Sequence, residues 1–124
     1  MFDNLKGMAS LAGVMQDLPR LKMRFEEVRD RLAAMEVDGE TGGGAVRAVA
    51  SGKLEIKSIT VEPSLIAGLV SADRPDDRAL AEELIVGAVN QALAKAREAA
   101  EAELRGAAEE LGLPLPPGGL GDLL

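Results

Sequence analysis

The chain has 124 residues, enough for one domain, and its net charge of −7 means that nucleic acid and anionic membranes repel it at long range. It contains no Cys and no His, which excludes disulfides, Cys- or His-ligated metal centres, Ser-His-Asp triads and Cys nucleophiles. The N-terminal sequence lacks the features of a secretory signal, and no run of about 18 apolar residues could span a bilayer. We therefore expect a cytoplasmic protein with no membrane partner.

The apolar content of 47% includes only two aromatic residues, both Phe. A core built from Leu, Val, Ile, Met and Ala buries less area per residue than one with aromatic rings. An isolated monomer is harder to stabilise in this way, so the composition favours an oligomer.

The first segment carries two series of apolar residues with seven-residue spacing, the pattern of a helix that packs along another helix. The first series is Leu11, Leu18, Phe25 and Leu32, and the second is Val14, Leu21, Val28 and Met35. Because proline is tolerated in a first helical turn but not in a helix interior, Pro19 predicts a helix from about 19 to 35, preceded by a weaker helical piece. The predicted core or dimer seam of this helix is Leu18, Leu21, Phe25, Val28, Leu32 and Met35.

Three β-prone stretches follow. They cover residues 36–40, 45–50 and 53–61, with Ser51-Gly52 as a two-residue turn and Pro63 after the last strand. The alternation of polar and apolar residues changes phase after Lys57, so either a bulge reverses the strand there or both faces are covered.

The remainder of the chain predicts helix. Residues 63–66 can form a short helical turn, and Asp76 or Asp77 can cap a long alanine-rich helix that Gly112 ends. The fold class is α+β with the order α-β-β-β-α: a three-stranded antiparallel meander flanked by an N-terminal helix and a long C-terminal helix. We expect a single domain over residues 1–112 and a flexible Pro/Gly-rich tail over 113–124.

The glycines at 42–44 pose a choice between a phosphate-binding loop and a hairpin corner. A P-loop requires Lys and Ser or Thr after its last glycine, where this chain has Ala45-Val46. A dinucleotide fingerprint opens a helix, whereas these glycines precede a strand. Consecutive glycines instead supply positive φ angles to a tight loop, so we predict a corner between two strands.

A set of residues around this corner resembles the signature of the YbaB/EbfC family of nucleoid-associated proteins. The matching positions are Val37, Gly39, Glu40, Gly42, Gly43, Gly44, Val46, Gly52, Ile59, Val61, Pro63, Ser64 and Leu65, together with Ala88-Val89-Asn90 and Ala92. The resemblance covers nearly the whole chain. It implies an α–β–β–β–α homodimer with protruding helices, which binds DNA with little sequence preference and has no enzymatic activity or cofactor.

The cations of the first helix are the candidate DNA-binding residues: Arg20, Lys22, Arg24, Arg29 and Arg31. They flank the apolar seam, where they either grip phosphates or pair with carboxylates of the long helix such as Glu82, Glu83, Glu98 or Glu101. Second-rank candidates on the strands and their turn are Arg47, Lys53 and Lys57.

Two function classes remain after this reading. One is a homodimer that binds DNA in the nucleoid through backbone contacts, because two copies of the basic helix would present two cationic arms despite the acidic total. The other is a dimeric protein–protein interaction module with weak or no DNA binding. No catalytic set, metal site or small-molecule substrate is indicated, and the acidic run at 73–77 is read as a turn with a helix cap.

Overall fold

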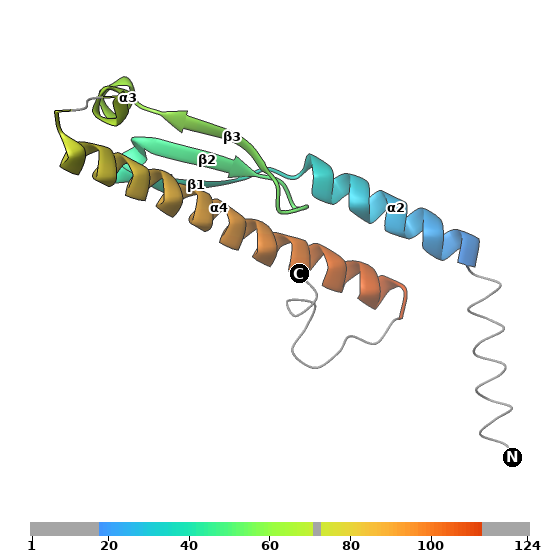
Figure 1. The fold of residues 1–124 in the computed structure, drawn as a ribbon. Coiled ribbons are helices and arrows are strands. Elements are labelled where there is room, and N and C mark those ends of the chain that lie inside the picture. Colours follow the sequence, from blue (N-terminus) through green and yellow to red (C-terminus); the bar gives the residue numbers. More distant parts are fainter. Residues whose placement is uncertain (1–17, 71–72, 113–124) are drawn as a thin grey trace, which may run out of the picture.

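The computed structural model describes residues 18–70 and 73–112, so the predicted weak helical piece before Pro19 and the predicted tail at 113–124 lie outside the described residues. The elements are α2 (Leu18–Ala34), β1 (Val37–Thr41), the short 3-10 turn η1 (Gly42–Gly44), β2 (Val46–Ala50), β3 (Ile56–Val61), α3 (Pro63–Val70) and α4 (Pro75–Glu110). Figure 1 shows α4 running along one face of the sheet and beyond its end, with α2 extending beside the far half of α4. The strands form an antiparallel meander in the order β1-β2-β3, which confirms the predicted α+β class.

The core lies between the sheet and α4 and is made of very small side chains. Its fully buried members are Val46, Ala48, Ala50, Ala88, Ala92 and Ala96. A Cβ on Gly39 of β1 would lie 2.4 Å from the carbonyl oxygen of Ala88 and 2.6 Å from the amide nitrogen of Ala92. The strand can therefore approach the helix backbone this closely only because position 39 has no side chain.

The glycine corner connects β1 to β2. Gly42, Gly43 and Gly44 have φ angles of 62°, 67° and 94°, a region that residues with a Cβ rarely adopt. Thr41 pairs with Val46 across the corner, and the two strands are antiparallel. The prediction of a hairpin corner instead of a phosphate-binding loop is confirmed.

The phase change in the third strand is a β-bulge. Val49 pairs with Ser58, but its neighbour Ala50 pairs with Ile56, which leaves Lys57 as the extra residue. Because of this extra residue, Ile56 and Ile59 both lie on the α4 side of the sheet despite their odd spacing. Of the two explanations that the sequence allowed, the bulge is the one observed.

The predicted two-residue turn and the predicted start of the third strand at Lys53 are wrong. The strand begins at Ile56, and a longer turn precedes it in which the Ser51 hydroxyl accepts a hydrogen bond from the Lys53 amide (3.2 Å). Leu54 has a φ of 64° in this turn, which takes it out of the extended conformation. The Gly52 amide donates to the Leu32 carbonyl (2.8 Å), and a Cβ at position 52 would lie 2.9 Å from that oxygen. The turn is longer than predicted because it also docks on the end of α2.

Two details of the C-terminal half also differ from expectation. The short helical turn at 63–66 is an eight-residue helix, α3. The predicted cap of α4 is wrong, because Pro75 is the first helical residue and Arg74, at the cap position, makes no capping hydrogen bond. Asp76 and Asp77 lie inside the first turn, where carboxylates stabilise the positive end of the helix dipole. The predicted end holds, since Gly112 follows the last turn with a φ of 67°.

Candidate nucleic-acid interface

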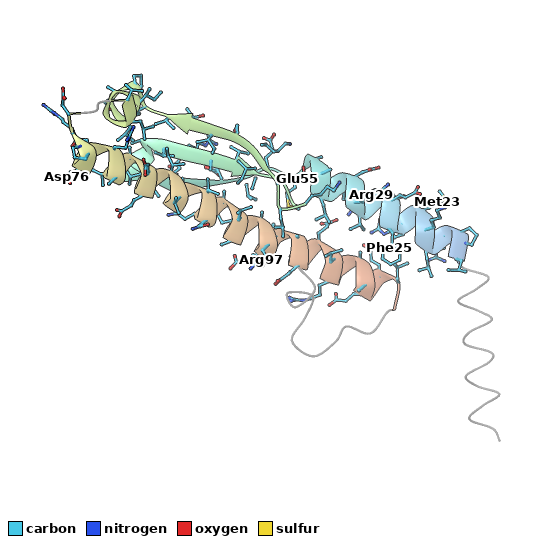
Figure 2. The ribbon with its side chains drawn as sticks, viewed as in Figure 1. Met23, Phe25, Arg29, Glu55, Asp76 and Arg97 are labelled. Atoms are coloured by element: carbon cyan, nitrogen blue, oxygen red, sulfur yellow. The ribbon has the colours of Figure 1, made fainter. Side chains whose placement is uncertain are left out.

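The helix α2 is the least covered element that carries candidate residues. Val28 is its buried side chain, while Leu18 and Phe25 are 50% and 53% exposed. The other seam residues, Leu21, Leu32 and Met35, are half-buried. Figure 2 shows Phe25 on the side of α2 towards α4 and Met23 on the opposite side. The predicted apolar seam is thus covered near Val28 and exposed towards Leu18.

Two of the five first-rank cations are bound to carboxylates of the same chain. Arg24 forms ion pairs with Glu27 (2.8 Å) and with Glu110 of α4, and Arg31 pairs with Glu103 of α4 (2.7 Å). The hydrogen bond from Arg24 to Glu27 is the main cause that raises the pKa of Arg24 above its ordinary value; desolvation opposes it, and the charge of Glu110 adds to the rise. Arg24 is therefore a permanent cation whose charge is already compensated.

Two of the second-rank cations are also compensated. Arg47 lies on the sheet face opposite α4, 3.3 Å from Asp38 and 3.9 Å from Glu40. Lys57, the bulge residue, pairs with Glu36 at 3.2 Å. The polar face of the sheet is consequently close to neutral around its cations.

The remaining candidates, Arg20, Lys22, Arg29 and Lys53, are exposed and make no ion pair within residues 18–70 and 73–112. With about 100° of rotation per helical residue, Lys22 and Arg29 project from one side of α2, whereas Arg20 projects from the side that carries Arg24 and Arg31. An open apolar groove, whose lining includes Leu18, Lys22 and Arg29, runs along the first side. The first-rank candidates thus form two cationic edges instead of one patch.

The second-rank residue Lys53 is placed by the turn that contains it. Its neighbour Gly52 is hydrogen-bonded to Leu32, so Lys53 lies beside the C-terminal end of α2. Lys53 is thus the second-rank candidate whose backbone lies nearest to α2.

The carboxylates that pair with α2 are not those that the sequence suggested. Within residues 18–70 and 73–112, none of Glu82, Glu83, Glu98 and Glu101 forms an ion pair with α2, which runs antiparallel to α4 and instead meets Glu103 and Glu110. A signal was available in the spacing: Glu103 and Glu110 are seven residues apart, as are Arg24 and Arg31. Matching heptad spacings of opposite charge on two helices indicate an antiparallel pair.

Further cations that were not singled out lie on α4. Lys95, Arg97 and Arg105 are exposed, and Figure 2 shows Arg97 on the side of α4 away from the sheet. The sequence did not distinguish these cations as a group, because glutamates lie among them along the helix.

Neither a metal centre nor a membrane segment is found in the described part of the chain. No group of three or more potential metal ligands occurs among those residues. None of the helices within them combines the length and the apolar character needed to cross a bilayer.

Comparison with known proteins identifies the family of this chain. The model of the YbaB/EbfC DNA-binding family matches residues 8–111. A protein of Nitrobacter hamburgensis (strain DSM 10229 / NCIMB 13809 / X14) called "Nucleoid-associated protein" is 36% identical over 115 residues, which cover 92% of this chain and 100% of the relative. The chain belongs to the YbaB/EbfC DNA-binding family.

Proposed function

We propose that this protein is a nucleoid-associated homodimer that binds duplex DNA through phosphate contacts, with little dependence on base sequence. The observation that carries the proposal is the pair Lys22 and Arg29 on an outlying helix, with Arg20 nearby on its other edge, none of which forms an ion pair with another described residue. Flexible, exposed cations on a convex helix suit phosphate contacts, which position a protein on DNA without reading bases.

Dimer formation is supported by the open end of the apolar seam. Leu18 and Phe25 are about half exposed and lie on the groove side of α2. A second copy would cover them and would also double the number of cationic helices, so that a chain of net charge −7 presents two local basic sites. No catalytic role is proposed, since the family is one of DNA-binding proteins.

The test is fluorescence anisotropy of a labelled duplex at about 50 and 200 mM salt, because multi-phosphate contacts weaken by orders of magnitude across that range. Lys22→Gln/Arg29→Gln should lower the steepness of the salt dependence by about two phosphate contacts. The control is Arg74→Gln/Arg78→Gln, which removes the same charge at the start of α4, away from α2. Equal losses in both variants, or no binding by the parent protein, would contradict the proposal.

A protein–protein interaction module remains the second candidate function. The observation that favours it is the same half-exposed apolar edge, Leu18 and Phe25, in a chain of acidic total charge. Association through such an edge is largely insensitive to salt, whereas phosphate binding is not. A folded protein that binds no duplex at either salt concentration would favour this alternative.

A further inference from the structure

One side of α4 carries carboxylates beyond the end of the sheet. Positions 96, 103 and 110 are seven residues apart and therefore lie along one side of the helix. Ala96 is fully buried against the sheet, but the next two positions carry Glu103 and Glu110. Ala100 and Ala107 are also buried on this side of α4, and Glu103 and Glu110 lie between and beyond them as the carboxylates that bind α2.

The two ion pairs on this side of α4 are in antiparallel register. Arg24 meets Glu110 and Arg31 meets Glu103, so a shift of seven residues along α2 corresponds to seven residues back along α4. We call these four residues the clasp. The side chain of Arg24 is 20% exposed and that of Glu103 is 26% exposed, which makes each the more covered member of its pair.

The clasp occupies groups that would suit phosphate. A guanidinium donates two parallel hydrogen bonds equally well to a carboxylate or to a phosphate. Arg20 lies one turn before Arg24 on the same edge of α2, and it makes no ion pair within the described residues. If Glu103 and Glu110 released their partners, Arg20, Arg24 and Arg31 would form one row of cations along the helix.

The clasp is also suited to exchange. The outer members of the two pairs, Glu110 and Arg31, are 61% and 53% exposed. Ion pairs with one exposed member are weakly held and readily replaced, because water and salt compete for them. The apolar side chains of α2 that oppose separation are Val28, which is buried, and Leu21 and Leu32, which are half-buried, while Leu18 and Phe25 are about half exposed.

We propose that Glu103 and Glu110 act as an internal competitor for phosphate: they hold Arg24 and Arg31 in the absence of DNA and yield them to the phosphodiester backbone on binding. The inference rests on the proposed function and adds a regulatory element to it. Its consequence is that the intrinsic affinity of the cationic edge is partly masked by the protein itself.

The experiment compares Glu103→Gln/Glu110→Gln with the control Glu98→Gln/Glu109→Gln, using anisotropy of a labelled duplex of about 20 base pairs in about 100 mM salt. Both variants remove two negative charges from α4, and neither control residue forms an ion pair within the described chain. The clasp variant should bind about fivefold more tightly than the control, given the modest strength of two partly exposed pairs. Equal affinity of the two variants would overturn the competitor role.

A second measurement separates release of the arginines from a general change in charge. In the background Arg24→Gln/Arg31→Gln the advantage of the clasp variant over the control should disappear, as a double-mutant cycle requires of coupled groups. An advantage that persists in that background would overturn the inference. Absence of binding by the parent and by every variant would overturn the proposed function itself, and the competition with it.

Discussion

Two regions of this molecule are stabilised by different kinds of interaction. The body consists of the three strands with α3 and α4. In it, the sheet packs on α4 through Gly39 and a row of buried alanines. The arm, which is α2, is held by two arginine–glutamate pairs with α4, by the buried Val28 and by half-buried apolar side chains such as Leu21 and Leu32. Backbone-to-backbone packing tolerates almost no displacement, whereas ion pairs can exchange partners. The helix that we propose as the DNA contact is thus held partly by exchangeable ion pairs, whereas the sheet is held on α4 by close packing.

The largest expected effect comes from adding a side-chain atom where β1 lies directly against the backbone of α4. Gly39→Ala would place a Cβ 2.4 Å from the Ala88 carbonyl, so β1 must move away from α4. We expect a loss of about 3 kcal/mol or more in the free energy of unfolding, at the upper end of the range for overpacking. Urea denaturation measures it. A loss below about 1 kcal/mol would show that the close approach is not a requirement.

The next largest effect concerns the joint between the two regions. Gly52→Ala would bring a Cβ to 2.9 Å from the Leu32 carbonyl, and the hydrogen bond between these residues must lengthen. We expect a loss of about 2 kcal/mol, from overpacking and one weakened hydrogen bond. Hydrogen exchange should accelerate in α2 more than in β1. Uniform acceleration would argue against a local joint.

A smaller effect of opposite sign is expected at the far end of α4. Gly106 lies between the two clasp glutamates, and a Cβ there would meet no atom within 4 Å. Gly106→Ala should stabilise the protein by about 0.5–1 kcal/mol, because alanine has the higher helix propensity. Thermal unfolding by circular dichroism measures the gain. Destabilisation would mean that α2 lies closer to this position than the structure shows.

The smallest effect on stability is expected from the open edge of the arm. Leu18→Gln/Phe25→Gln alters side chains that are 50% and 53% exposed, so the monomer should change by less than about 1 kcal/mol. The same variant should weaken self-association, which sedimentation velocity detects as a shift towards the smaller species. Unchanged association would place the dimer contact elsewhere on the molecule.

The course of the chain was largely predictable from the sequence. Pro19 and the seven-residue spacing predicted α2 within one residue at each end, and Pro63 and Gly112 ended β3 and α4 as expected. The phase change after Lys57 allowed a bulge as one of two explanations. Failures occurred where tertiary contact overrides local signals. The turn after β2 is lengthened by docking on Leu32, and the start of α4 follows proline chemistry instead of an aspartate cap.

The candidate site was predictable in composition but not in arrangement. The cations of α2 were identified by type and heptad position, but which of them are compensated depends on where α4 ends relative to α2. The position of α4 relative to α2 depends on how far α4 extends beyond the sheet, which a local sequence pattern does not predict. The matching seven-residue spacings of arginine and glutamate were the one available indication.

The hydrogen bond from Gly52 to Leu32 places the point about which α2 can rotate near one end of the helix. It fixes α2 near its C-terminal end, while Arg20 lies about 18 Å further along the helix at 1.5 Å per residue. A rotation of about 10° at this pivot would move Arg20 by about 3 Å, close to the rise of about 3.4 Å per nucleotide along one DNA strand. If DNA releases the two ion pairs to α4, as proposed, such a rotation would let α2 adjust to the groove width and curvature of the bound duplex without a change in the sheet.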